Sequence, residues 1–185
     1  MKIRNYEEKD KEFVRFVCLN CDEPFNSSEK SKNFFLSVYC DYYIEHEPDN
    51  CFVIADENDV AVGYIISTED FDKFKVCFLE EYYTRLDEND VLERQSAIES
   101  FLPQEEYKND YPAHFHIDIM PDFQRMGFGS QLIDTLVEHL KQKNIKGLML
   151  TVWNQNEKGC NFYIKYGFTL LEERKNVNVF GLKIN

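Results

Sequence analysis

The sequence predicts an α+β fold in which a mostly antiparallel β-sheet is flanked by helices. Two short apolar segments, at 51–55 and 60–67, flank a turn-rich stretch, which is typical of a β-hairpin. An apolar stripe with helical spacing runs from Leu132 to Leu140. No internal repeat, low-complexity tract or linker interrupts the chain. We therefore expect residues 1–185 to form a single domain.

The first part of the chain supplies a strand, two helices and the hairpin. The segment KIRNY, at 2–6, is a strand candidate. Residues 7–19 place apolar side chains at helical spacing, and aromatic residues repeat in steps of one and three over 34–43. These two patterns predict one helix each.

The second part begins with an acidic, aromatic segment at 69–110, where we expect two helices broken near the DEND sequence. Asn156 is placed as an N-cap and Gly167 as a C-cap of a later short helix. The remaining expected elements are a strand at 113–120, a helix ending at about 143, a strand at 147–153, and two final strands at 168–174 and 176–184.

The overall charge excludes some partners. The formal net charge is −13. This charge argues against nucleic acid and against an anionic membrane, because phosphate contacts need Lys and Arg. It is compatible with a cationic substrate. The chain has no apolar run of the roughly 18–20 residues that span a membrane. Its start lacks the apolar core of a signal peptide, so we expect a cytoplasmic protein.

The cysteines do not follow a framework spacing. In a reducing cytosol such cysteines are expected to be free thiols. Cys18 and Cys21 form a lone C-x-x-C, but a zinc or redox site would need a second pair or a thioredoxin-like strand before it. We therefore expect no metal. The six residues are Cys18, Cys21, Cys40, Cys51, Cys77 and Cys160.

Two glycines mark a candidate anion site. In the segment FQRMGFGSQL, at 123–132, Gly127 and Gly129 stand where a helix is expected to begin. A helix N-terminus offers free N–H donors and a partial positive charge, and phosphate is its usual guest. No lysine follows Gly129 as a P-loop requires, and Leu132 replaces the third glycine of a dinucleotide fold. A plain helix-entry turn is the structural alternative.

A second block follows at a fixed distance. Gln124-x-x-Gly127-x-Gly129 is followed about thirty residues later by Asn156 and the segment NFYIKYGF, at 161–168. This combination resembles the Gcn5-related N-acetyltransferase (GNAT) superfamily. The resemblance implies a GNAT-like mixed sheet with a splayed central strand pair, and it makes 69–110 a helical insertion. The segment PAHFHIDI also looks like a subgroup that includes acetyltransferase-like domains of O-GlcNAc hydrolases.

The resemblance implies acetyl-CoA as co-substrate. Backbone N–H groups of the glycine loop would bind its pyrophosphate, and pantetheine would pair with the strand backbone as an added strand does. Gln124 stands where relatives often carry arginine, and Arg125 could replace that charge. The residues implied in carrier binding are Ile117, Ile119, Gln124, Arg125, Met126, Gly127, Phe128, Gly129, Ser130 and Asn156.

The implied reaction is attack of a primary amine on the thioester, which needs an acid and a base. Tyr163 occupies the family's acid position, and its phenol can protonate the departing thiolate. Its structural alternative is a core tyrosine, and Tyr166 is its rival on the same helix. An alkylammonium has a pKa of about 10.4, so it must lose a proton before attack.

The base candidates are His116 and Asp118, on the strand that borders the reaction centre in relatives. The alternatives are that both only form hydrogen bonds on the polar face of the sheet, or that a water chain takes the proton. Strand alternation puts His114, His116 and Asp118 on one face. A β-bulge, common at this position in the family, would reverse that assignment beyond it.

Three functions remain open on this sequence. The leading one is N-acetylation of a small molecule, peptide or protein. The alternative is a non-catalytic acyl-CoA-binding or partner-binding module, and the weakest is a structural domain that binds no CoA. The segment 69–110 could be an acidic lid for a cationic amine, but Phe and Tyr packing inward with charges outward is the favoured interpretation. The sequence leaves a homodimer open.

Overall fold

The computed structural model describes residues 1–21 and 28–184. One seven-stranded sheet has the order β1-β2-β3-β4-β5-β7-β6. All neighbouring strands are antiparallel except β4 and β5, which are parallel. This confirms the predicted fold class. The strands are β1 (Lys2–Asn5), β2 (Cys51–Ala55), β3 (Ala61–Thr68), β4 (Ala113–Ile119), β5 (Gly147–Trp153), β6 (Thr169–Glu173) and β7 (Val177–Lys183).

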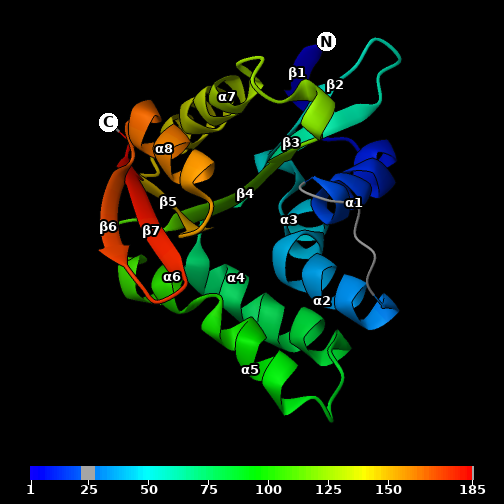
Figure 1. Ribbon diagram of the computed structural model, residues 1–185, viewed down its shortest axis with the longest axis vertical. Coiled ribbons are helices and arrows are strands. Elements are labelled where there is room, and N and C mark those ends of the chain that lie inside the picture. Colours follow the sequence, from blue (N-terminus) through cyan, green and yellow to red (C-terminus); the bar gives the residue numbers. More distant parts are fainter. Residues whose placement is uncertain (22–27, 185) are drawn as a thin grey trace.

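Helices cover both faces of the sheet (Figure 1). One face packs against α1 (Lys11–Asn20), α2 (Glu29–Tyr39) and α3 (Asp41–His46), and the other against α7 (Phe128–Gln142) and α8 (Glu157–Tyr166). Within the described part of the chain, no helix has both the length and the apolar character needed to cross a membrane. The helices between β3 and β4 are α4 (Phe71–Cys77), α5 (Val91–Glu99) and α6 (Leu102–Tyr107).

Two expected helices differ from the structure. The helix expected over 34–43 is two helices, because the backbone of Cys40 leaves the helical region at φ −133°. The segment 69–110 contains three α-helices instead of two, and α4 continues into a π-helical turn at Phe78–Tyr82. The expected break near the DEND sequence is present, since residues 86–90 separate the π-helical region and its short 3₁₀ extension from α5.

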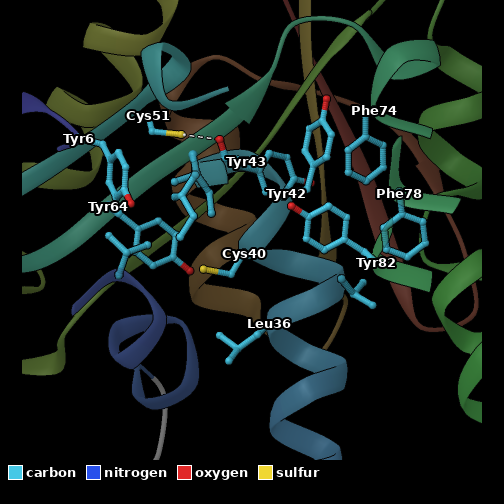
Figure 2. Close-up of a cluster of buried hydrophobic side chains, with 14 of the residues drawn as sticks. Tyr6, Leu36, Cys40, Tyr42, Tyr43, Cys51, Tyr64, Phe74, Phe78 and Tyr82 are labelled. Atoms are coloured by element: carbon cyan, nitrogen blue, oxygen red, sulfur yellow. Dashed lines mark hydrogen bonds between the residues drawn. The ribbon is translucent and has the colours of Figure 1, made fainter. Parts of the chain in front are cut away.

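The insertion contributes its aromatic residues to the core. Phe71, Phe74, Phe78 and Tyr82 are at most 2% exposed, and they pack with tyrosines of α3 in one cluster (Figure 2). The acidic side chains of Glu80, Glu81, Asp87 and Glu88 lie on the surface. This is the inward-aromatic, outward-acidic arrangement that the sequence favoured over a lid.

Strand β4 has continuous register with β3. The pairing runs from Thr68–His114 to Gly63–Ile119 with no shift, so the bulge considered above does not occur in these pairs. His114 packs in the cluster beside α3, whereas Phe115 packs in the cluster beside α7 and α8. The predicted alternation of the two faces along β4 is confirmed.

Strands β4 and β5 separate soon after they begin. Only Ala113–Leu148 and His114–Met149 are paired, although each strand has seven residues. The rest of β4 and β5 diverge, so the expected splayed pair is present. The gap opens toward the segment that leads into α7 (Figure 1).

Candidate functional site

Helix α7 begins without a capping side chain. Its N-cap is Gly127, which has φ +84° in the left-handed region that glycine adopts without strain. By contrast, α2, α4, α5 and α8 have a Ser, Asp or Asn whose side chain accepts a hydrogen bond from the first turn. No acidic residue occupies the first turn of α7. The N–H groups there and the helix dipole are thus available to an anion.

Gly129 has a packing role besides any role toward an anion. A Cβ atom at this position would lie 3.1 Å from the ring of Phe162 on α8. The missing side chain therefore lets α7 approach α8 closely. Sequence reasoning assigned both glycines to the anion and did not predict this contact, because Phe162 is far away along the chain.

The loop before α7 folds back onto the end of β4. The side-chain amide of Gln124 donates a hydrogen bond of 2.9 Å to the carbonyl oxygen of Ile119. Arg125 adopts φ +60°, and both Arg125 and Met126 are exposed. The Gln124 side chain thus braces the loop, and the binding roles of Gln124 and Arg125 toward a carrier stay predictions.

The backbone of β4 presents polar groups to the gap. The N–H of Met120 donates to the carbonyl of Val62, which places the even-numbered residues of β4 in hydrogen-bonded pairs with β3. The backbone groups of Ile117 and Ile119 therefore point away from β3, toward β5. Among the described residues β5 gives them no ladder partner, because its pairing with β4 ends at Met149. A ligand with amides can add to this edge as a strand would.

Helix α8 lies beside the same gap. Its N-cap is Asn156, whose side chain accepts from the N–H of Gly159 at 2.9 Å. Its end is Gly167, with φ +122°. Both predicted caps are confirmed.

Two tyrosines of α8 have different surroundings. Tyr166 donates a 2.6 Å hydrogen bond to Asp134 of α7, so its hydroxyl joins the two helices. Tyr163 is buried against Phe115 of β4 and Phe180 of β7. Burial raises the pKa of Tyr163, and the carboxylate of Asp118 raises it further. The Tyr163 phenol is therefore neutral at pH 7, as a proton donor must be.

On the opposite face of β4, three polar side chains form a connected group. The hydroxyl of Tyr64 donates to Asp118 at 2.6 Å and lies 2.9 Å from Nδ1 of His116. A hydroxyl has only one proton, and an ionised carboxylate only accepts. The Tyr64 oxygen therefore accepts from Nδ1–H of His116, which leaves Nε2 as the basic nitrogen of the neutral ring.

The structure brings His116 and Asp118 together, with 3.4 Å between Nδ1 and the carboxylate. These hydrogen bonds fit both interpretations made from the sequence, a base with its orienting partners and a structural network within the sheet. The role of His116 in proton transfer stays a prediction.

One member of this group, Tyr64, and two of its neighbours, Tyr39 and Cys18, were not predicted from the sequence. Tyr64 pairs with Asp118 in the β3–β4 register, and Tyr39 stacks on the His116 ring at 5.5 Å. The Sγ atom of Cys18 and the ligand atoms of His116 and Asp118 lie within 4.8 Å of one another. The alternating pattern of β4 was visible in the sequence, but the insertion between β3 and β4 hides their register.

His114 has no place in this group despite sharing its face. It is fully enclosed by aromatic rings, and Nε2 lies 3.0 Å from the hydroxyl of Tyr43. Burial lowers the pKa of His114 to about 3. The ring is therefore neutral and serves the core.

One segment of the chain matches a sequence family. Residues 97–168 match the sequence model of the Acetyltransferase (GNAT) family. The [ribosomal protein bS18]-alanine N-acetyltransferase of Haemophilus influenzae is 39% identical over 62 residues, and that of Escherichia coli strain K12 is 32% identical over the same length. Each match covers 34% of this chain and 42% of the relative. The chain thus spans less than half the length of these curated relatives.

Solved structures share the fold over the whole chain. The crystal structure of SsHAT has a TM-score of 0.86 at 22% identity, covering 100% of this chain and 98% of that one. The ribosomal-protein-S18-alanine N-acetyltransferase of Escherichia coli has a TM-score of 0.59 at 17% identity, covering 100% and 94%. The PaiA N-acetyltransferase of Thermoplasma acidophilum, solved with coenzyme A, has a TM-score of 0.61 at 15% identity, covering 98% of both chains.

Proposed function

We propose that this chain acetylates a primary amine with acetyl-CoA. Part of the chain matches the acetyltransferase (GNAT) family model, and the GNAT fold extends over its whole length. The observation that carries the proposal is the uncapped N-terminus of α7 beside the β4–β5 gap. The gap has an unpaired strand edge, and the helix has unsatisfied donors. A diphosphate carrying an amide-containing arm matches both features.

The carrier would be held mainly by backbone groups. The first-turn N–H groups of α7, from Phe128 to Ser130, would bind the pyrophosphate, with the loop from Gln124 to Gly127 shaping the turn. Ile117 would pair with the pantetheine amides, and Asn156 lies at the start of α8 beside the same gap. Bound acetyl-CoA supplies an acyl group on a thiol leaving group.

The chain would supply the proton transfers from opposite faces of β4. In the proposal, Nε2 of His116 takes a proton from the ammonium form of the acceptor, while Tyr64 and Asp118 hold the ring in the required tautomer. Tyr163 gives a proton to the departing sulfur. A C–N bond forms as the C–S bond breaks, and one proton is released to solvent for each amine acetylated.

The acceptor is proposed as an amine of a small molecule, peptide or protein. The named relatives act on a ribosomal-protein alanine, which makes a peptide N-terminus one member of this class to test. The formal net charge of −13 suits a cationic amine. None of the six cysteines, all within the described residues, forms a disulfide bond, which supports a reducing cytoplasm as the place of action.

Calorimetry with acetyl-CoA tests carrier binding, and thiol release with a panel of amines tests turnover. We expect micromolar binding and turnover with at least one member of a panel that includes polyamines and alanyl peptides. Tyr163→Phe should reduce turnover at least about tenfold, because a general acid typically contributes about 100-fold or more, and it should leave carrier affinity unchanged.

Tyr166→Phe is the matched control, because it removes a hydroxyl from the same helix that binds Asp134. It should keep turnover within about twofold, since a neighbouring exposed hydrogen bond has little effect on the reaction. A fully active Tyr163→Phe enzyme would refute the acid assignment. Binding without turnover for every amine would favour the non-catalytic acyl-CoA-binding module, and absence of binding would refute the proposal.

A further inference from the structure

A second group of metal-ligating side chains lies away from the β4–β5 gap. It joins His46, the last residue of α3, to Cys77 at the end of α4 and Glu81 in the π-helical turn. The Nε2 atom of His46 lies 3.5 Å from Sγ of Cys77 and 3.3 Å from a carboxylate oxygen of Glu81. The third side, from Sγ to the other carboxylate oxygen, is 3.7 Å.

These separations match a tetrahedral zinc site. Zinc lies about 2.3 Å from cysteine sulfur and about 2.0–2.2 Å from imidazole nitrogen or carboxylate oxygen. Tetrahedral angles then place the ligand atoms about 3.4–3.6 Å apart. The 3.5 Å separation of nitrogen and sulfur falls in this range, and the two carboxylate oxygens of Glu81 lie near it, one at 3.3 Å from the nitrogen and the other at 3.7 Å from the sulfur. Sulfur, imidazole and carboxylate together form a donor set that suits Zn²⁺ better than Mg²⁺ or Ca²⁺.

The surrounding residues hold the imidazole ring in position. The His46 ring stacks on Tyr42 at 5.3 Å with an interplanar angle of 15°, and Tyr82 meets it edge-on at 5.7 Å. Both tyrosines are fully buried in the core of Figure 2. An ion would therefore meet a ring whose orientation the core has already fixed, so little ordering is needed on binding.

The two other ligands come from consecutive turns. Cys77 and Glu81 are four residues apart, so they lie on one side of the helical segment. π-Helical turns are rare in proteins, and those that occur are often found at functional sites. The Glu81 side chain is 50% exposed and that of His46 32% exposed, which gives an ion an entry path and leaves a fourth position for water.

The group at Cys18 is a weaker candidate for the same chemistry. There, Nδ1 of His116 and the Asp118 carboxylate already share the Tyr64 hydroxyl, which would have to move before an ion could bind. The lone C-x-x-C at Cys18 and Cys21 gave no sign of the group at Cys77, because its ligands are not all close in sequence. His46 is 31 residues from Cys77, and only the packing of the insertion on α3 joins them.

We propose that His46, Cys77 and Glu81 form a three-ligand site for Zn²⁺ that ties the insertion to α3. On binding, the Cys77 sulfur gives up its proton to solvent and bonds to the ion, and no electron is transferred. The ion would bridge two elements that already meet through aromatic packing and through the 2.6 Å hydrogen bond that the Tyr82 hydroxyl donates to Glu45 of α3.

Titration of the reduced, metal-free full-length chain with ZnCl₂ against a chromophoric chelator tests the proposal. We expect one tight equivalent. Substitution with Co²⁺ should give a thiolate-to-metal charge-transfer band and the visible bands of tetrahedral coordination. Cys77→Ser and His46→Gln should each weaken Zn²⁺ binding at least about tenfold, since even outer partners of a metal ligand contribute that much.

Glu81→Gln and Glu80→Gln form a matched pair. Each removes one exposed negative charge, but only Glu81 has an oxygen within reach of the other ligands. Glu81→Gln should weaken binding at least about fivefold more than Glu80→Gln if coordination and not general charge holds the ion. Because both side chains are exposed, neither change endangers folding, which circular dichroism would verify.

The Cys18→Ser variant distinguishes the two candidate metal sites, one containing Cys77 and the other containing Cys18. It should leave the stoichiometry and the charge-transfer band unchanged. If Cys18→Ser abolished the band while Cys77→Ser kept it, the ion would belong beside His116 and the proposal would be wrong. It would also be wrong if Glu80→Gln matched Glu81→Gln, or if no equivalent bound. None of these readouts depends on acetyl transfer.

Discussion

The two faces of strand β4 differ sharply in chemistry. On the face toward α7 and α8, Phe115 and Ile117 pack among apolar side chains, and Tyr163 is the polar residue beside them. On the face toward α1–α3, alternate positions hold His116 and Asp118, bonded through Tyr64. One strand thus separates an apolar wall from a titratable group by a single residue step.

This difference suggests that the two faces have separate roles in the proposed reaction. On the α7–α8 face, backbone groups would bind and orient the carrier and a neutral phenol would protonate its sulfur. On the α1–α3 face, His116 would take the proton from the acceptor. Substitutions on the two faces should therefore alter different measured quantities.

His116→Asn should have the largest effect on turnover. The variant keeps a polar group on the strand but removes the basic Nε2, and loss of a general base reduces rates by about 100-fold or more. Steady-state thiol release should show kcat lower by about that factor, while calorimetry shows acetyl-CoA affinity within about twofold of the native value. A loss of carrier affinity equal to the loss in kcat would show that the two faces do not act separately.

His114 should affect stability and its pH dependence, not turnover. Its pKa of about 3 in the folded state lies below the usual value near 6.5, so the unfolded chain binds this proton first as the pH falls. Stability is therefore full above about pH 7 and is lost on acidification, by about 2 kcal/mol between pH 7 and pH 5. Urea unfolding at the two pH values measures this loss.

His114→Gln should flatten that dependence by the same amount, although it also lowers stability at pH 7. An unchanged slope in the His114 variant would assign the acid sensitivity to other groups. Among these is His139, whose pKa is also lowered, chiefly by burial.

Gly129→Val should have the smallest effect, about tenfold weaker acetyl-CoA binding with kcat little changed. The added side chain meets the Phe162 ring and shifts the first turn of α7, at a packing cost of about 1 kcal/mol. Calorimetry and urea unfolding would measure the two effects.

Phe162→Leu in the same chain distinguishes packing from direct obstruction. If the shift of α7 weakens binding, the smaller side chain should restore part of the affinity, as a double-mutant cycle would quantify. Absence of rescue would indicate that the valine itself blocks the approach of the pyrophosphate. Unaltered affinity in the single variant would count against the α7 N-terminus as the carrier site.

Local patterns were sufficient for most of the fold. The alternation along β4, the apolar stripe of α7, and the caps Asn156 and Gly167 depend on neighbouring residues, and each was predicted correctly. The extra helix break at Cys40 was not predicted, because the aromatic spacing continues across it and only tertiary packing determines the kink. The π-helical turn has no simple sequence signal either.

The candidate site was less accessible to sequence reasoning. His116 and Asp118 were identified from one strand, but Tyr64 comes from a strand separated from it by the insertion, and its partner could be found only through the register. Gly129 was recognised as important for one reason and has a second, its contact with Phe162. The O-GlcNAc hydrolase subgroup stays a prediction.

The short pairing of β4 with β5 has a mechanical consequence. The sheet consists of two parts, β1–β4 and β5–β7–β6, that are joined by only two residue pairs between β4 and β5. Next to these two pairs, Tyr111 at the end of the insertion packs on Met149 and Val179, away from the C-terminal ends of β4 and β5. A change in the side-chain volume of Tyr111 is therefore expected to alter the distance between the C-terminal ends of β4 and β5 without replacing any residue that lines the space between them.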